Sequence, residues 1–298
     1  METLTVGQRV CRAILEEASS IKAGNVHPQA SFSNMTYRDF QVASEAIGQA
    51  IDASRHTHSL GEIIFASVQA MAQAVSVNTS LGTILLMVPM TLCSESSFPS
   101  FAKQRNIQDY VWNPQRFQKC ILEVIHESTH EDSQRIYEAI RIANPGGLGK
   151  VDSGDIAQAA PVSILQAMEQ ASSWDDVALQ YANGYEQIIQ WTSRLIELAS
   201  QHAKRTDAIR QLQIEILASR PDSLIVRKSG IDVGKQVQFR AYEVLQSGRY
   251  ASPAFEKAWR QFDEYLRENG HRKNPGTVAD LIAATVFLAS YAWEPIDG

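Results

Sequence analysis

Apolar and polar positions recur with a helical period along most of the chain. In the first segment, Val6, Val10, Ile14 and Ala18 follow one another at four-residue steps, and this stripe ends near Ile21. Residues at this spacing share one face of a helix. A second helix is predicted after Thr36, with Asp39 completing a capping box and Phe40, Ala43, Ile47 and Ile51 on its apolar face. The same pattern predicts helices at Leu60–Val77, Pro114–His130, Asp132–Ala143, Val162–Ala171, Tyr185–Ala199, Ala208–Ser219, Asp232–Ser247, Pro253–Asn269 and Val278–Trp293.

Evidence for strands is thin. Leu224-Ile225-Val226 is a short apolar run, and no Asn-Gly or Asp-Gly turn joins two alternating segments. The polar stretch Ser94–Asn113 is expected to form a long loop. No internal repeat or linker divides the sequence. We therefore expect an all-α fold, a single domain over residues 1–298 with roughly ten to thirteen helices of ordinary length.

Composition limits the classes of partner. The 298 residues are 44% hydrophobic, carry a net charge of −6 and have a pI near 5.7, which disfavours a general grip on nucleic acid or on an anionic membrane. Cys11, Cys93 and Cys120 are far apart and are expected to be reduced thiols. No signal peptide is visible, and the apolar run Thr83–Leu92 is too short for a membrane span, which needs about 20 residues. We expect a cytoplasmic protein; Val278–Trp293 either fills its core or forms the face of a homodimer.

One pentapeptide has the form of a zinc site. His126-Glu127-Ser128-Thr129-His130 is an H-E-x-x-H sequence, which on a helix places both imidazoles on one face with the glutamate as general base. Its continuation is strongly polar, and Thr129 is also a plausible cap for a following helix. We favour a solvated helix end and keep a zinc hydrolase as an alternative.

A second segment resembles a phosphate-binding loop. Pro145-Gly146-Gly147-Leu148-Gly149-Lys150 is rich in glycine, but a Walker A loop needs glycine where Asn144 stands and Ser or Thr where Val151 stands. A turn between helices is one interpretation. A backbone surface for a phosphate or nucleotide is the other.

Four further segments combine polar residues and glycine with apolar neighbours. They are Lys22–Pro28, Asn78–Gly82, Arg220–Gly230 and Asn274–Asp280. Asp280 is the most informative residue, because Ala279, Leu281 and Ile282 surround it. A carboxylate there is either a buried cap or a ligand for a metal or a substrate hydroxyl, and Asn78 is either a helix cap or a site residue. Together the segments predict a polar site at converging helix ends.

In this order the segments resemble the triphosphoribosyl-dephospho-CoA synthase family, from about Glu16 to Ala289. The family's P-K-P-G-x-V is similar to Lys22–Val26, its N-T-H-K-G to Asn78–Gly82, and its G-E before a proline to Gly154-Asp155. Its D-T-x-x-x-x-R-G-G is similar to Asp222–Gly230. Its P-G-x-x-A-D-L matches the segment that begins at Pro275-Gly276 and ends at Asp280-Leu281.

The chain also departs from the family pattern. Ser80 and Leu81 stand where the N-T-H-K-G signature has His and Lys, and Phe32–Met35 stands where the family has H-x-D-M. The Pro-Gly-Gly-Leu-Gly and Arg-Lys-Ser-Gly sequences resemble a divergent branch found in methanogens, methylotrophs and planctomycetes. That branch often occurs among genes for tetrahydromethanopterin-linked one-carbon metabolism.

The resemblance implies a transferase that joins ribose C1 of ATP to a hydroxyl of dephospho-CoA and expels adenine, with Mg²⁺ as cofactor. Carboxylates near the sugar would stabilise positive charge at C1. The resemblance assigns catalysis to Asp222, Asp280 and His27, and the metal to Asp222 and Asp280. Substrate binding falls to Lys22, Asn25, Asn78, Thr79, Gly82, Asp155, Ser223, Arg227, Lys228, Asn274 and Gly276.

Two other functions remain open at this stage. The same bond chemistry with another acceptor would be a pentosyl transfer onto a tetrahydromethanopterin or other one-carbon cofactor precursor. A non-catalytic helical protein that binds a nucleotide or a protein partner would also explain the lost signature residues.

Overall fold

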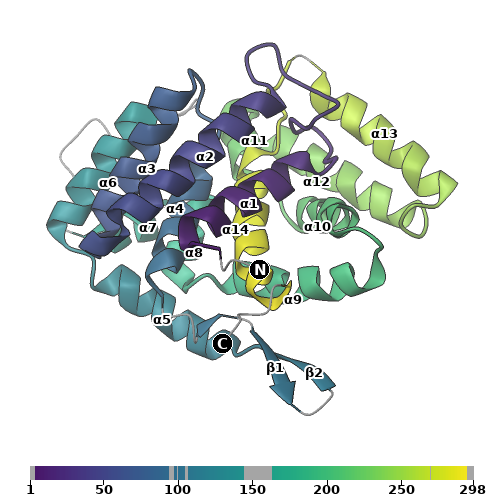
Figure 1. Ribbon diagram of the computed structural model, residues 1–298. Helices are drawn as coiled ribbons and strands as arrows, with labels where there is room; N and C mark the ends of the chain where they lie inside the picture. The colour runs from purple at the N-terminus through teal and green to yellow at the C-terminus, as the bar shows by residue number, and fades with distance from the viewer. Residues whose placement is uncertain are drawn as a thin grey trace.

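The computed structural model describes residues 4–93, 97–98, 100–104, 107–143, 163–268 and 270–293. Most of this part of the chain is helical, which confirms the all-α prediction (Figure 1). The helices are α1 (Val6–Ser19), α2 (Tyr37–Ser54), the 3₁₀ turn η1 (Arg55–Thr57), α3 (Leu60–Ala74), α4 (Leu81–Leu92), α5 (Pro114–His126), α6 (His130–Ala143), α7 (Ile164–Ala171), α8 (Asp176–Asn183), α9 (Glu186–Gln201), α10 (Arg205–Ser219), α11 (Ser223–Ser229), α12 (Ile231–Gln246), α13 (Pro253–Arg267) and α14 (Gly276–Trp293).

The described residues therefore contain fourteen α-helices, more than the predicted ten to thirteen. The helices absent from the predicted set are α4, α8 and α11, of which α8 and α11 are only eight and seven residues long. Leu224-Ile225-Val226 lies in α11 and is not a strand, because the Asp222 side chain caps this helix by accepting the N–H of Ile225 at 2.9 Å.

The loop predicted over Ser94–Asn113 contains a two-stranded antiparallel hairpin. Strands β1 (Ser100–Gln104) and β2 (Ile107–Val111) pair from Ser100 opposite Val111 to Gln104 opposite Ile107. The hairpin extends away from the helices (Figure 1). Its connection lacks the Asn-Gly or Asp-Gly signal that identifies tight hairpins in a sequence.

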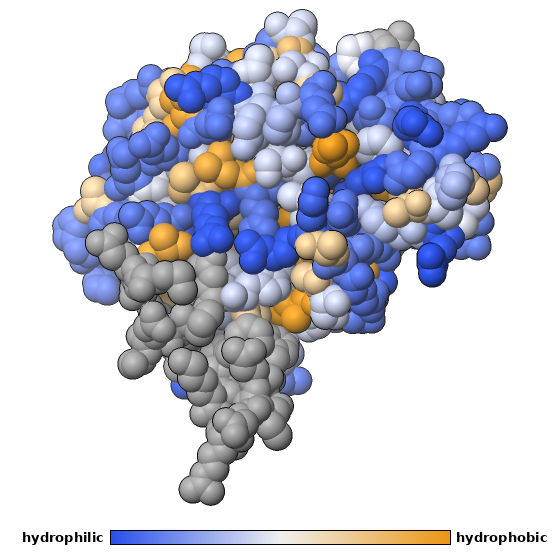
Figure 2. All heavy atoms as spheres, turned by 45° about the vertical axis from the view of Figure 1, so that its right-hand side comes forward, coloured by the Kyte–Doolittle hydropathy of each residue, from blue (hydrophilic) through white to orange (hydrophobic). Residues whose placement is uncertain are grey.

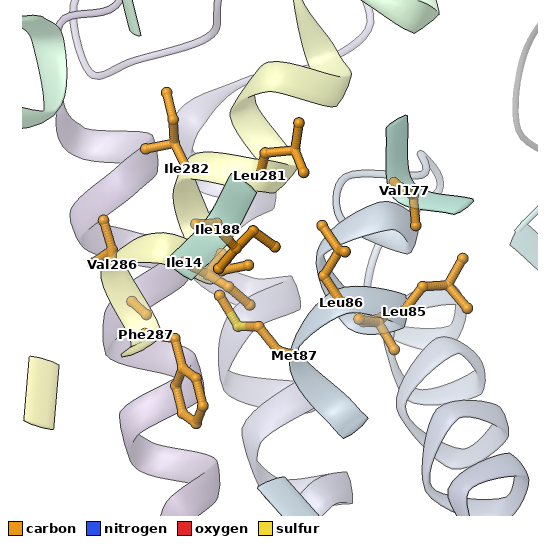
Figure 3. Close-up of a cluster of buried hydrophobic side chains, with 14 of the residues drawn as sticks. Ile14, Leu85, Leu86, Met87, Val177, Ile188, Leu281, Ile282, Val286 and Phe287 are labelled. Atoms are coloured by element: carbon orange, nitrogen blue, oxygen red, sulfur yellow. The ribbon is translucent and has the colours of Figure 1, made fainter. Parts of the chain in front are cut away.

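Helix α14 lies at the centre of the fold and packs against α1, α4, α9 and α10 (Figure 1). It is apolar on all sides, which is typical of a buried helix. Of the described helices, it alone has the length and apolar composition to cross a membrane, but 72% of it is buried inside the protein. Figure 3 shows Ile14 of α1, Leu86 of α4, Ile188 of α9 and Phe287 of α14 meeting in this core. The described part of the face in Figure 2 is mainly hydrophilic, with hydrophobic residues in small separate patches.

Helix α4 contains a proline, and the backbone carbonyl that this proline leaves without a helical N–H donor accepts a hydrogen bond from another helix. Pro89 has no N–H to donate to the carbonyl of Leu85, four residues earlier. The buried hydroxyl of Tyr181 on α8 donates to that carbonyl at 2.6 Å. The Tyr185 hydroxyl donates to the next carbonyl, that of Leu86, at 3.0 Å. These two bonds tie α4, whose N-terminus belongs to the candidate site, to the α8–α9 region.

Candidate active site

A cavity of about 830 Å³ lies where several helix ends meet. Its polar wall comes from the end of α1, the N-termini of α4 and α14, and the last turn of α11. Its apolar wall comes from α6, α7 and α8. Of the predicted site residues, the cavity is lined by Asn25, Asn78, Thr79, Gly82, Arg227, Lys228, Asn274, Gly276 and Asp280.

Asp280 projects from α14 to the N-terminus of α4. Its Oδ1 accepts the Thr83 N–H at 3.0 Å and the Thr83 hydroxyl at 2.6 Å. Gly82 permits this approach, because a Cβ at that position would lie 2.3 Å from Asp280 Oδ2. Burial raises the pKa of Asp280 to about 7, the Thr83 hydroxyl opposes this rise, and the charge of Glu17 adds to it. Asp280 thus presents a carboxylate in the cavity whose charge depends on pH near neutrality.

Asp222 occupies a different environment from Asp280. Its Oδ1 accepts the Ile225 N–H in α11 at 2.9 Å, and its Oδ2 accepts the Val278 N–H in α14 at 2.8 Å. The side chain is fully buried and does not line the cavity. Burial raises its pKa to about 7, and the Val278 and Ile225 N–H groups oppose this rise. Because it is fully buried away from the cavity, Asp222 does not fit as a metal ligand beside Asp280.

Lys22 is fully buried and does not reach the cavity. Its ammonium donates to the carbonyl oxygens of Glu17 and Ser20 and lies 3.1 Å from Glu17 Oε1. Ser223 is also set back from the cavity. Its hydroxyl donates to Thr277 at 3.1 Å and accepts the Asp176 N–H at 3.2 Å.

Asn25 joins two of the predicted segments. Its amide group donates to Asn274 Oδ1 at 2.7 Å, and its Oδ1 accepts from Gln213 at 2.8 Å. Asn78 Oδ1 accepts the Leu81 N–H at 3.1 Å, so this side chain helps to cap α4 while lining the cavity. The turn that holds Asn25 begins at Gly24, where φ is +71° and a Cβ would lie 2.8 Å from Leu266.

His27 lies outside the cavity lining. Its Nδ1 accepts the Gln29 N–H at 3.3 Å, and its Nε2 faces the Arg267 guanidinium at 3.4 Å. Burial, together with the charge of Arg267, lowers the pKa of His27 to about 4. The imidazole is therefore neutral at pH 7.

The cationic side of the cavity belongs to α11. Arg227 lies 3.2 Å from Asp175 Oδ2, and both side chains line the cavity. Burial, reinforced by Arg227, lowers the pKa of Lys228. Asp155 and the Pro145–Lys150 segment lie outside the described residues.

Several lining residues escaped the sequence analysis. Glu17 lies on the apolar face of α1, three residues after Ile14 and seven after Val10, so an acidic residue within the apolar stripe was the signal available for it. Trp174 is 56% exposed, and Phe32 stacks on His271 with ring centroids 4.9 Å apart. The sequence offered one signal for Trp174 and Phe32, because each is an aromatic residue with polar neighbours on both sides.

The zinc-hydrolase alternative is wrong. His126 ends α5 and His130 begins α6, so the two imidazoles do not share a helix face. Thr129 and Asp132 cap α6 reciprocally: the Thr129 N–H donates to Asp132 Oδ2 at 2.8 Å, and the Asp132 N–H donates to Thr129 Oγ1 at 3.1 Å. Among the described residues, no three His, Cys, Asp or Glu side chains are grouped to hold a metal.

Comparisons with known proteins give the same family throughout. A Stutzerimonas stutzeri protein described as a probable 2-(5''-triphosphoribosyl)-3'-dephosphocoenzyme-A synthase is 28% identical over 148 residues. This match covers 50% of the chain and 47% of the relative, so the chain spans about half of that relative's length. A crystal structure of an Archaeoglobus fulgidus protein, described as a "putative triphosphoribosyl-dephospho-CoA synthase", has the same fold. Its TM-score is 0.62 at 20% identity, over 85% of this chain and 99% of that one. Residues 3–295 match the family described as ATP:dephospho-CoA triphosphoribosyl transferase, and the chain belongs to this family.

Proposed function

We propose that this chain transfers the triphosphoribosyl group of ATP to a hydroxyl of dephospho-CoA and releases adenine. The family provides the reaction class. The observation that carries the proposal is Asp280, a carboxylate in the cavity wall whose Oδ2 accepts no hydrogen bond from the described residues. Displacement at ribose C1 builds positive charge on the sugar, and a fixed carboxylate stabilises that charge.

The phosphates are assigned to the α11 side of the cavity. Helix N-termini often bind phosphate, but carboxylates already occupy those of α4 and α14. A second anion there would be repelled. Arg227 and Lys228 line the cavity instead and supply positive charge for the phosphate oxygens.

Magnesium is proposed to enter with ATP, bound mainly through phosphate oxygens, as is usual for this ion. The pair Asp222 and Asp280 is not proposed as its binding site, because Asp222 is fully buried and does not line the cavity. The neutral imidazole of His27, outside the cavity lining, is assigned a structural role. We propose that the protein works in the cytoplasm.

The test is adenine release from Mg-ATP, with and without dephospho-CoA, followed by mass analysis of the products. The proposal expects adenine and a triphosphoribosyl adduct of dephospho-CoA in equal amounts. Intact ATP in the presence of well-folded protein and dephospho-CoA would overturn this acceptor. A second arm with phosphoribosyl donors and pterin precursors then distinguishes another acceptor from a protein that only binds nucleotides.

A further inference from the structure

Glu17 is a second carboxylate in the wall of the cavity that holds Asp280. It lies in the last turn of α1, is 5% exposed and lines the cavity. Helix α1 packs against both α4 and α14, the two helices joined by the Asp280–Thr83 contact. In the proposed function, Asp280 stabilises the positive charge on the sugar. No residue is yet assigned to accept the proton of the acceptor hydroxyl.

Lys22 holds Glu17 in place. The chain turns back after α1, and the Lys22 ammonium meets the carbonyl oxygens of Glu17 and Ser20 and the Glu17 side chain at Oε1. The two carbonyl oxygens accept hydrogen bonds from the ammonium group, and Glu17 Oε1 is paired with it by charge alone, with no hydrogen-bond partner among the described residues. A cation at this position also interacts favourably with the last carbonyls of the helix. Lys22 is therefore committed to Glu17 and is unable to turn toward a phosphate.

The two cavity carboxylates act on each other through space. The charge of Glu17 is one of the causes that raise the pKa of Asp280. Burial also raises the pKa of Glu17 and lowers that of Lys22, while the attraction between the two opposes both changes. The charged groups identified around Glu17 are thus Lys22, just after α1, and Asp280 on α14. Because two carboxylates in different environments differ in their affinity for a proton, one is able to stabilise positive charge while the other accepts a proton.

We propose that Glu17 takes the proton from the acceptor hydroxyl, and that Lys22 is the residue that positions it. This inference rests on the proposed function. The acceptor oxygen forms a bond to ribose C1 as its proton passes to Glu17. The bond from C1 to adenine breaks, and its electron pair leaves on the adenine ring nitrogen. The proton is then returned through cavity water to adenine, so that one proton moves from the acceptor to the leaving group.

The first test is Glu17→Gln, measured as kcat/KM for adenine release over pH 5–9. Loss of a general base lowers the rate by about 10²–10⁴-fold. The wild-type rate is expected to fall along an acid limb as Asp280 and Glu17 bind protons; in the variant the fall due to Asp280 is expected to remain and that due to Glu17 to vanish. ATP binding, measured by calorimetry, is expected to change less than about threefold. Glu16→Gln is the matched control, because Glu16 pairs with Arg205 at 2.6 Å and does not line this cavity.

A second pair of variants separates chemistry from folding. Glu17→Gln leaves the buried ammonium of Lys22 without its counter-charge, whereas Glu17→Gln with Lys22→Met removes both charges. The folded double variant is expected to be as inactive as Glu17→Gln. Lys22→Met alone is expected to move the acid limb to higher pH, because its cation favours the ionised form of Glu17.

The outcomes distinguish this inference from the proposed function. A wild-type protein that forms no adduct overturns the proposed function and this inference with it. An active wild type with an unchanged rate and acid limb in the folded double variant overturns the assignment of Glu17 alone. An unmoved acid limb in Lys22→Met overturns the positioning role of Lys22.

Discussion

Asp222 and Asp280 both accept backbone N–H groups at helix N-termini, but the two carboxylates have different roles. Asp222 uses one oxygen for the α11 N-terminus and the other for the α14 N-terminus, and it is fully buried. Asp280 uses a single oxygen for both Thr83 donors, and it lines the cavity. Burial raises the pKa of each carboxyl to about 7. A raised pKa therefore does not identify the reactive residue.

The difference lies in how many oxygen atoms the fold uses. Asp222 joins two helices through both of its oxygens and is buried away from the cavity. Asp280 is held by one oxygen and keeps the other available on the cavity side, as Gly82 allows. The same substitution at these two positions should therefore affect different properties of the protein.

The largest effect is expected for Asp280→Asn on catalysis. An asparagine keeps an oxygen for Thr83 but removes the negative charge beside the sugar. We expect kcat/KM to fall by about 10³-fold, equivalent to about 4 kcal/mol. Adenine release at pH 8 measures it. Asp232→Asn, on an exposed turn of α12, is the control and should retain activity within about twofold. Full activity in Asp280→Asn would remove the basis of the proposed site.

Asp222→Asn should act on stability instead. Its new amide group would face the Val278 N–H, which donates to Oδ2 at 2.8 Å in the wild type. A buried donor without an acceptor costs about 1–3 kcal/mol, and the lost charge weakens the α11 cap as well. We expect the free energy of unfolding at pH 8 to fall by about 3 kcal/mol in urea titrations. An unchanged midpoint of unfolding would contradict the two-helix role.

The pH dependence of stability sharpens the comparison. The unfolded chain loses the Asp280 proton near pH 3.8, but the folded protein loses it near pH 7. Between these values the unfolded state binds fewer protons, so the contribution of Asp280 to stability falls as pH rises. Relative to wild type, Asp280→Asn should therefore gain about 2–3 kcal/mol of stability between pH 4.5 and 8. Urea unfolding of both proteins at both pH values measures this gain. If the free energy of unfolding of Asp280→Asn differed from that of wild type by the same amount at both pH values, the raised pKa would be contradicted.

Amphipathic helices were predictable from the sequence, and so was the long apolar α14, but α4, α8 and α11 were not predicted. The stripe of Phe40, Ala43 and Ile47 identifies α2, whose Thr36–Asp39 capping box is confirmed. Helix α4 is apolar on almost every side, and α8 and α11 span about two turns, so their residues show no useful period. The β1–β2 hairpin lacks a turn signal of its own.

Parts of the site were predictable for a similar reason. Asp280 is conspicuous because its neighbours in sequence are apolar. Glu17 carried a comparable signal that the sequence analysis did not use, because it lies on the apolar face of α1, whereas the preceding residue, Glu16, lies off this face and forms an ion pair with Arg205. The helical period predicts that Glu17 faces inward, but that this face meets a cavity depends on how α1 packs against α4 and α14, and this long-range contact leaves no mark in the local sequence.

The smallest expected effect tests whether Gly82 matters through Asp280. A Cβ at residue 82 would lie 2.3 Å from Asp280 Oδ2, so Gly82→Ala must displace the carboxylate. Alanine is otherwise favoured in a helix by about 1 kcal/mol, which offsets part of the strain. We expect stability to change little and kcat/KM to fall by about tenfold, or about 1.4 kcal/mol. If alanine acts by moving Asp280, adding it to Asp280→Asn should have almost no further effect on kcat/KM. An undiminished tenfold loss in the double variant would mean that residue 82 acts on the substrate directly, and that the position of the Asp280 carboxylate is not what Gly82 provides.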